Sequence, residues 1–220
     1  MKRAVYFGNP WIGMFMVSNE KNTILPLDVP AKLEQAVIEE LKTEVIKTGI
    51  ADSNLLGVYI VMNSHGIILP NIANDAEIEI LKKNGMNIYK SNDRYNANGN
   101  NIAVNDNGGI INENISHEER VKIADVLGVE LVPMKIAGYS TVGSCVRTNN
   151  TGFLVHYAAD EQMIKELERV FRVKGAEGSV NTGTGFVSYG IVANRNGYVA
   201  GEATTAYELG RVEEALGFIK

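Results

Sequence analysis

One cysteine and three histidines are the residues of this chain that most readily suggest catalysis or metal binding. A Cys-His pair can form an activated nucleophile, and Cys with His can bind zinc at characteristic spacings. No such spacing links His65, His117 and His156, so no metal site is predicted. Cys145 lies in an apolar stretch that we interpret as an ordinary strand, where a small buried residue is expected.

A short glycine motif and two pairs of acids also invite a chemical interpretation. Gly183-Thr184-Gly185 resembles the start of a dinucleotide fingerprint, but residues 186–189 are predicted to form a strand instead of the helix that would hold phosphate. The pairs Glu39-Glu40 and Glu213-Glu214 lie on predicted helices with lysines nearby, which is typical of a solvated face. We therefore predict a protein that is not an enzyme and has no cofactor.

A repeated pattern organises the whole chain. An apolar segment ends in Asn, turns, and continues as a second apolar segment, and this occurs five times at intervals of 42 to 45 residues. Repeats of this length indicate solenoids, propellers or rings. The anchoring residues are Asn19, Asn63, Asn105, Asn149 and Asn194; six residues earlier come Gly13, Gly57, Gly99, Gly143 and Ser188, and three residues later come Asn22, Gly66, Gly108, Gly152 and Gly197.

Each turn is predicted to close on a left-handed residue, because Gly and Asn adopt that conformation at little cost. In the second repeat, residues 54–63 and 67–70 are predicted strands. A helix follows from a capping box at Asn74 and Glu77, and residues 87–90 form a third strand. The order strand, strand, helix, strand then recurs in the other repeats.

The chain is predicted to form a single α/β domain, a closed ring of five such units with pseudo-fivefold symmetry. The units span about residues 8–50, 51–93, 94–137, 138–180 and 181–220, and the fifth has no third strand of its own after its helix. A leading strand at residues 3–7 would supply it and close the ring, because exposed sheet edges invite aggregation. An open solenoid is the alternative.

The amino-acid composition indicates the cellular compartment and the kinds of partner that this ring is expected to have. The 220 residues are 45% hydrophobic, enough for a substantial core, and the net charge is −5 without a concentrated basic run. Binding to nucleic acid through phosphate neutralisation is therefore not predicted to be the main activity. A single cysteine and the lack of any long apolar stretch favour a soluble protein of a reducing compartment, with no membrane partner.

Four segments give the chain a family resemblance. They are residues 54–57 with 63–70 (Asn-Ser-His-Gly-Ile-Ile-Leu-Pro), 124–130 (Ala-Asp-Val-Leu-Gly-Val-Glu), 141–144 (Thr-Val-Gly-Ser) and 201–205 (Gly-Glu-Ala-Thr-Thr) before Glu208. In this order the sequence resembles the translation initiation factor 6 family, the ribosome anti-association factors of archaea and eukaryotes. The resemblance covers the whole length, and the absence of a long C-terminal tail is similar to the archaeal branch.

The resemblance implies the pentein fold, a ring of five α/β units, and a monomeric cytoplasmic protein. It also implies binding to the joining face of the large ribosomal subunit, chiefly through a ribosomal protein beside the sarcin-ricin loop, with a possible minor contact to ribosomal RNA. Such binding would block the small subunit sterically and would require no catalysis.

The resemblance further implies that Asn100, directly after Gly99, contacts the large subunit. By the repeat, its equivalents beside Gly13, Gly57, Gly143 and Ser188 should lie on the same face; they are Met14, Val58, Ser144 and Tyr189. The position of Val58 is commonly Arg in eukaryotic members, so a charged contact there is not expected in this chain.

Two other functions fit the same ring. A hydrolase or amidinotransferase of this fold would use Cys145 with His156 and an acid, and rapid alkylation of the thiol at neutral pH would favour it. A generic protein-binding ring is the other alternative, because repeat architecture does not define a partner.

Overall fold

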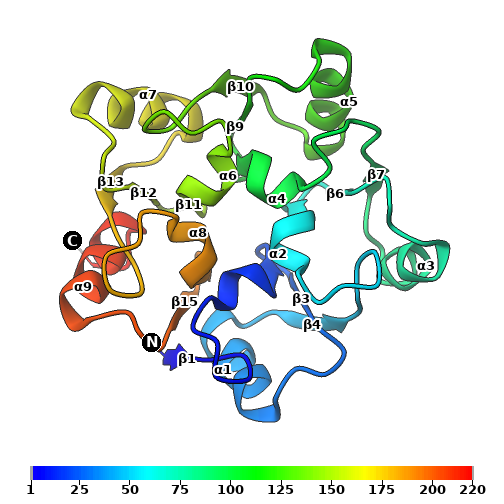
Figure 1. Cartoon of the computed structure of the whole chain (residues 1–220), viewed down its shortest axis with the longest axis horizontal. Coiled ribbons are helices and arrows are strands. Elements are labelled where there is room, and N and C mark those ends of the chain that lie inside the picture. Colours follow the sequence, from blue (N-terminus) through cyan, green and yellow to red (C-terminus); the bar gives the residue numbers. More distant parts are fainter. Residues whose placement is uncertain (1, 220) are drawn as a thin grey trace.

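The computed structural model describes residues 2–219, which form a ring of five α/β units about a central axis (Figure 1). Within these residues, five three-stranded sheets radiate from the axis, and a longer helix lies at the outer edge of each unit. Closer to the axis, every unit contributes one short helical turn. The predicted closed ring is therefore confirmed.

The five units share one order of elements. Unit 1 contains η1 (Ile12–Met14), β2 (Val17–Ser18), β3 (Asn22–Leu25), α1 (Ala31–Leu41) and β4 (Glu44–Lys47). Unit 2 contains α2 (Leu56–Tyr59), β5 (Val61–Met62), β6 (Ile67–Leu69), α3 (Asp75–Lys83) and β7 (Ile88–Lys90). Unit 3 contains α4 (Asn98–Asn101), β8 (Ile102–Val104), β9 (Gly109–Asn112), α5 (His117–Leu127) and β10 (Leu131–Met134).

Units 4 and 5 repeat that order. Unit 4 contains α6 (Val142–Cys145), β11 (Val146–Thr148), β12 (Phe153–His156), α7 (Glu161–Phe171) and β13 (Gly175–Gly178). Unit 5 contains α8 (Val187–Gly190), β14 (Ile191–Asn194), β15 (Gly197–Gly201) and α9 (Ala206–Ala215), with β1 (Lys2–Ala4) as its third strand.

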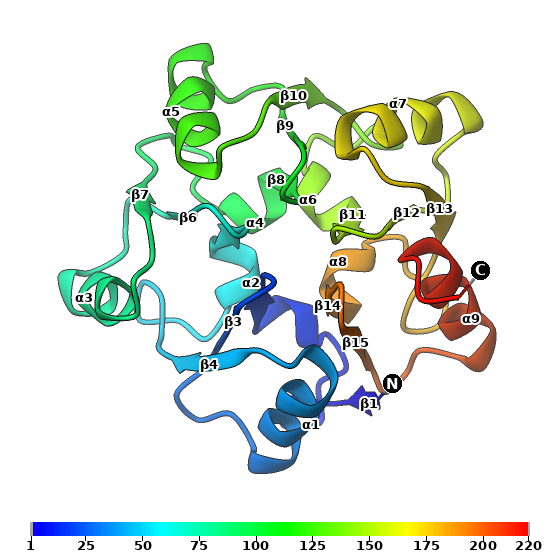
Figure 2. The same ribbon diagram turned by 180° about the vertical axis from the view of Figure 1, so that it is seen from behind.

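Each sheet combines an antiparallel hairpin with a parallel crossover. The first two strands of a unit pair antiparallel, and the third pairs parallel with the second after the outer helix. The parallel pairing of β1 with β15 joins Lys2 to Val199 and Ala4 to Gly201, so the first and the last strand of the chain lie side by side in one sheet (Figure 2). The leading strand therefore closes the ring, although it is shorter than the predicted residues 3–7.

Polar caps define where the outer helices begin. Thr205 and Glu208 form a reciprocal capping box on α9, and Asn74 and Glu77 form one on α3, so that the first amides of both helices are satisfied. Asp160 caps α7 by accepting from the Met163 amide. These local signals fix the outer layer of the ring and thereby the spacing between neighbouring units.

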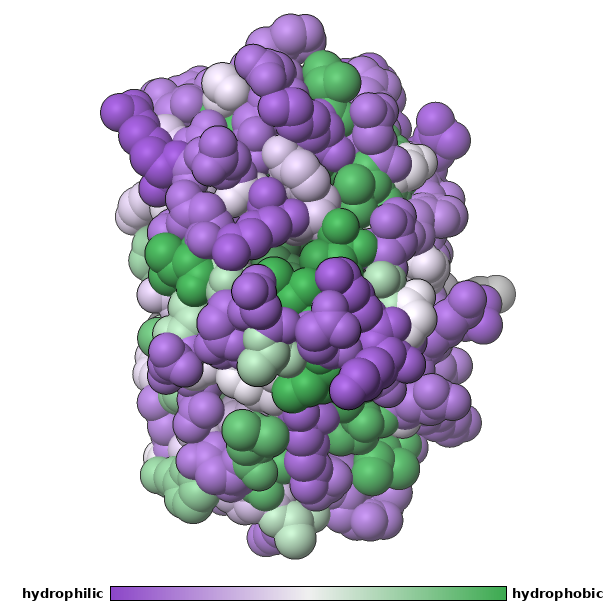
Figure 3. All heavy atoms as spheres, turned by 90° about the vertical axis from the view of Figure 1, so that its right-hand side faces the viewer, coloured by the Kyte–Doolittle hydropathy of each residue, from purple (hydrophilic) through white to green (hydrophobic). Residues whose placement is uncertain are grey.

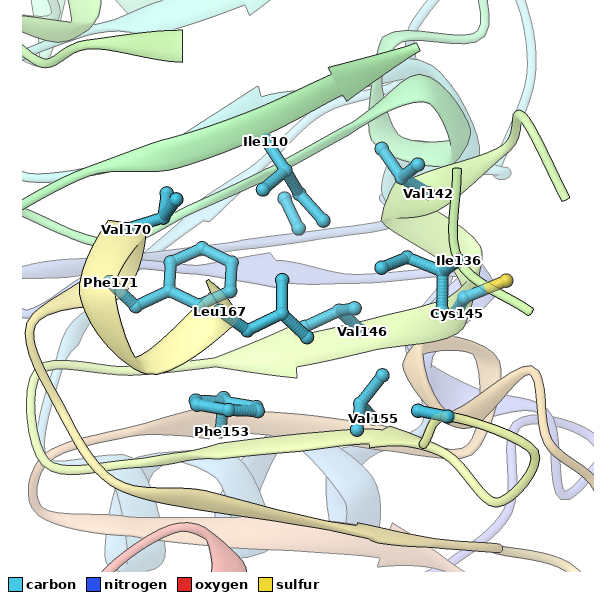
Figure 4. Packing of buried hydrophobic residues seen from close by; sticks show 12 residues of the cluster. Ile110, Ile136, Val142, Cys145, Val146, Phe153, Val155, Leu167, Val170 and Phe171 are labelled. Carbon is cyan, nitrogen blue, oxygen red and sulfur yellow. The ribbon is translucent and has the colours of Figure 1, made fainter. Parts of the chain in front are cut away.

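Each hydrophobic core cluster combines the side chains of one unit with a few from the preceding unit in the ring. In one cluster, Ile110 of unit 3 packs with Val146, Phe153 and Phe171 of unit 4, all of them buried (Figure 4). No unit could bury this surface alone, which is the property of repeat proteins that makes closure stabilising. The side of the ring that Figure 3 shows is mostly polar, with apolar patches between hydrophilic side chains.

Several local predictions were wrong. The predicted strand at residues 54–63 begins with the helical turn α2, and residues 186–189 lie mostly in the helical turn α8. Cys145 likewise ends the turn α6 and does not lie in a strand. A short apolar run has the same composition in a buried helical turn as in a buried strand, so periodicity cannot separate them.

Candidate functional site

The five short helical turns form a tightly packed circle at one end of the axis. We call Gly13, Gly57, Gly99, Gly143 and Ser188 the glycine circle. A Cβ on Gly57 would overlap the carbonyl oxygen of Gly13, one on Gly99 would overlap that of Gly57, and one on Gly13 would overlap that of Ser188. Glycine is therefore required by the close approach of adjacent units. Contact between residues 13 and 188 closes this circle as well.

Each predicted contact residue comes directly after a member of the glycine circle in the sequence. These residues differ in how far they are exposed to solvent. Ser144 is 1% exposed, and its hydroxyl donates to the Thr141 carbonyl over 2.6 Å. Met14, Val58, Asn100 and Tyr189 are partly exposed. The structure thus brings the five positions together around one end of the ring, with Ser144 covered.

Asn100 carries an unusual polar group. Its side-chain Oδ1 is buried and has no hydrogen-bond partner within residues 2–219. An unsatisfied buried acceptor costs about 1–3 kcal/mol, and such groups call for a functional explanation. Asn98 of the same turn also has a buried side-chain Nδ2 without a partner among these residues, but Asn98 is 1% exposed whereas Asn100 is partly exposed.

Aromatic side chains border the same end at the junction of units 4 and 5; of these, the sequence predicted Tyr189 but not Tyr139 or Phe186 as part of the site. The Phe186 ring lies 5.0 Å from that of Tyr139 and 6.0 Å from that of Tyr189, measured between centroids. Tyr139 is 43% exposed. Partly exposed tyrosines are frequent anchors in protein interfaces. Because Tyr139 and Tyr189 are far apart in sequence, no local pattern could have grouped them.

At the other end of the first strands, the anchoring asparagines form a second circle, which we call the asparagine circle. The side-chain Nδ2 of each anchor donates a hydrogen bond to the main-chain oxygen of the next anchor around the ring. The donor–acceptor distances are 2.9 Å for Asn19 to Asn63, 3.1 Å for Asn63 to Asn105, 3.0 Å for Asn105 to Asn149, 3.0 Å for Asn149 to Asn194 and 3.3 Å for Asn194 to Asn19. Five hydrogen bonds thus link all five units in one closed chain.

The turns after these anchors correct a second prediction. None of the residues Asn22, Gly66, Gly108, Gly152 and Gly197 has a positive φ. Instead, the anchor's Oδ1 accepts from the amides two and three residues on, as Asn63 does from His65 and Gly66. Glycine is present because a Cβ at Gly66 would lie 2.5 Å from the Val126 carbonyl of the next unit.

Acidic groups border the asparagine circle. Hydrogen bonds from Ser64 and Asn150 hold the pKa of Asp106 below its usual value against the opposing effect of burial. Burial raises the pKa of Glu20, which accepts from the Arg195 amide. The two ends of the ring therefore differ: one carries charged groups of both signs beside the asparagine circle, whereas the other carries asparagine, apolar and aromatic groups.

The geometry around Cys145 does not favour nucleophilic catalysis. Its thiol is 0% exposed in the core between units 3 and 4, beside Ile136 and Val142 (Figure 4). Burial raises its pKa to about 11, so the thiol is neutral at pH 7. His156 stacks among aromatic rings, and its Nδ1 accepts from the Ala158 amide. Within residues 2–219, no cluster of three or more His, Cys, Asp or Glu side chains could hold a metal ion.

The glycine motif at residues 183–185 is structural. Gly183 has φ +101°, and its amide donates to Glu208 over 2.8 Å, which joins the turn to the start of α9. A Cβ on Gly185 would overlap the His156 ring. Both glycines are explained by the packing of units 4 and 5, so no phosphate site is needed to account for them.

The fold, the glycine circle and the asparagine circle together define the class of protein. It is a closed ring of five units, in which neighbouring units contact each other through glycines and asparagines. A family model described as the eIF-6 family matches residues 1–215. The chain is 39% identical to translation initiation factor 6 of Picrophilus torridus over 98% of this chain and 99% of that protein. It is 35% identical to the protein of the same name from Methanocorpusculum labreanum and 36% to that from Pyrobaculum aerophilum, over 96% of both chains in each case. The chain belongs to the eIF-6 family.

Proposed function

We propose that this protein acts in translation by binding the large ribosomal subunit through the glycine-circle end and sterically preventing its association with the small subunit. Family membership supports the role in translation, because the relatives are named translation initiation factor 6. A ribosomal protein beside the sarcin-ricin loop is the proposed main partner, with a minor RNA contact. The same proposal holds that the protein acts in the cytoplasm and as a monomer.

Asn100 is the single observation that carries the choice of face. Its covered Oδ1 has no hydrogen-bond donor within residues 2–219, and it lies beside a backbone that the glycine circle makes rigid. A rigid ring end with an incompletely bonded amide and bordering tyrosines suits a polypeptide partner, because little ordering is required on binding. The described part of the chain also has no helix long and apolar enough to cross a bilayer.

The test compares two asparagines at opposite ends of the ring. Asn100→Arg should weaken cosedimentation with purified large subunits at least about tenfold, since it places bulk and charge at the proposed interface. Asn107→Arg is the matched control, because Asn107 is exposed beside the asparagine circle. Added wild-type protein should also leave the two subunits separate on a gradient. Equal binding by both variants would contradict the proposed face.

The alternative enzyme is addressed by a separate measurement. Cys145 should resist alkylation at neutral pH until the protein unfolds, since the thiol is buried and neutral. Rapid labelling of the native protein would favour a Cys-dependent hydrolase or amidinotransferase instead.

A further inference from the structure

A small cavity on the ring axis is lined by a charged side chain that belongs to neither circle. The cavity has a volume of about 40 Å³ and lies between the glycine circle and the asparagine circle, against the first strands of the units. A buried water needs about 10–15 Å³ measured in this way. The space therefore accommodates one small ion with a water molecule, or a few waters.

Arg147 is the one charged side chain among the described residues that line this cavity. It lies two residues before its anchor asparagine, where the other units carry Val17, Val61, Ala103 and Val192. The repeat thus places an apolar side chain at this position four times and a guanidinium once. A neighbouring departure accompanies it, because the glycine circle contains Ser188 in place of a fifth glycine.

Arg147 is only partly satisfied by the protein. Its Nη2 donates to the Ser188 hydroxyl over 2.7 Å and to the Ser188 carbonyl over 3.1 Å. Its Nε is buried and has no partner within residues 2–219. The Ser188 hydroxyl is engaged through a lone pair, so its hydrogen is left to donate. Two donors of this pair thus have no acceptor in the described part of the chain.

Carboxylates do not balance this charge. Among the described residues, none that line the cavity is Asp or Glu. Glu20 and Asp106 line a separate space of about 20 Å³ at the asparagine circle. Glu20 accepts from the Arg195 amide, and Asp106 accepts from Ser64 and Asn150. Burial lowers the pKa of Arg147 to about 10, which still leaves it charged at pH 7. The Nε of this guanidinium is thus removed from solvent with no carboxylate beside it, which is unfavourable.

We propose that the axial cavity is a binding site for a small monovalent anion such as chloride, held by the Arg147 guanidinium and the Ser188 hydroxyl. The ion neutralises the guanidinium and accepts from the donors that the fold leaves free. The small size of this space favours a monatomic ion over a larger anion. Since Ser188 belongs to the glycine circle, the ion also stabilises the junction between units 4 and 5 close to Tyr189.

Thermal unfolding of the full chain in different sodium salts at equal ionic strength tests this site. Chloride or bromide, at about ten times its dissociation constant, should raise the melting temperature by about 3–6 °C relative to gluconate. Arg147→Met, which replaces the guanidinium by an apolar side chain, should remove this difference between salts. The absolute stability of the variant does not matter, because only its dependence on the anion is compared.

Arg94→Met is the matched control, since Arg94 is exposed in a loop, and it should keep the wild-type response to chloride. Crystals grown with bromide should show an anomalous peak beside Arg147 in the wild type and none in Arg147→Met. An equal salt response in the wild type and Arg147→Met, or a bromide-free cavity containing water only, would overturn the proposal.

Discussion

The junction between units 4 and 5 is tightly closed, whereas the junction between units 1 and 2 is open. At the closed junction, Asn149 donates to the carbonyls of Asn194 and Leu216 over 3.0 and 3.4 Å, and Thr151 donates to Leu216 over 2.8 Å. A Cβ on Gly152 would overlap the Ala215 carbonyl. The end of the outer helix α9 is therefore locked onto the turn of the preceding unit.

At the open junction the corresponding helix is shorter. Helix α3 has nine residues, whereas α1, α5 and α7 have eleven and α9 has ten. Asn22 replaces the turn glycine, and within the described residues the Nδ2 of Asn19 donates to Asn63 alone. A polar groove of about 720 Å³ remains, bordered by Lys21, Lys42 and Asn87. Glycine is thus needed only where a full-length helix reaches the turn.

Among substitutions that test the difference between the two junctions, Gly152→Val should destabilise the protein most. The added side chain collides with backbone atoms of Ala215 and Leu216, which no side-chain rotation relieves. We expect the free energy of unfolding to fall by about 4 kcal/mol, measured by urea denaturation. A loss below about 1 kcal/mol would show that the closed junction yields easily.

The second largest effect is expected from removing an anchor asparagine, and its size should differ between the closed and the open junction. Asn149→Ala eliminates donors to two buried carbonyls and the acceptor of the Thr151 and Gly152 amides, at a cost of about 3 kcal/mol. Asn19→Ala loses a single carbonyl contact and its own turn amides in a more exposed place, at about 2 kcal/mol. Chevron or equilibrium denaturation of both variants measures the difference. The reverse order would refute the assignment of open and closed junctions.

Acid should weaken the closed junction through Glu208, which caps α9. Hydrogen bonds from the Thr205 and Gly183 amides and the Ser179 hydroxyl lower the pKa of Glu208 below its usual value, outweighing burial. Its contribution is therefore complete above the unfolded pKa of about 4.3 and is lost as pH falls through the lower folded value.

Glu208→Gln should consequently lower stability by about 1–2 kcal/mol at pH 7, where the charged hydrogen bonds are present. The gap between variant and wild type should narrow as pH falls from 5 to about 3, as followed by denaturant midpoints across this range. A gap that stays constant with pH would indicate that shape alone matters at this position.

The smallest change in stability is expected from a substitution at the open junction. Asn22→Ala should change the free energy of unfolding by no more than about 0.5 kcal/mol, because the groove leaves room beside residue 22. Equilibrium denaturation beside Gly152→Val tests the contrast directly. A loss comparable to that of Gly152→Val would mean that the two junctions are equally constrained.

Particular residues show how far the sequence could be interpreted. The regular recurrence of the anchor asparagines predicted the number of units and the antiparallel hairpins, and the leftover N-terminal strand predicted closure. The turn glycines were identified correctly but explained wrongly, because Gly66 is required by Val126 of another unit. Residues 54–63 were predicted as one strand because a buried helical turn is equally apolar.

The candidate site was predictable only in part. The repeat grouped Met14, Val58, Asn100, Ser144 and Tyr189 by position, and the resemblance supplied Asn100 as a contact residue. Neither could show that Ser144 is covered, that the Oδ1 of Asn100 has no partner in the described residues, or that Tyr139 borders the same end. These are properties of surfaces formed by several units at once.

By itself, the sequence determined the period of the chain and the capping box of the outer helix α3, because these depend on residues close together along the backbone. Only the tertiary structure decided which glycines are irreplaceable, which amide at the ring end is unsatisfied and why Arg147 has no carboxylate beside it. The physical reason is that each of these depends on atoms contributed by a neighbouring unit, about one repeat or more away in the sequence. A residue's local pattern contains no information about those atoms.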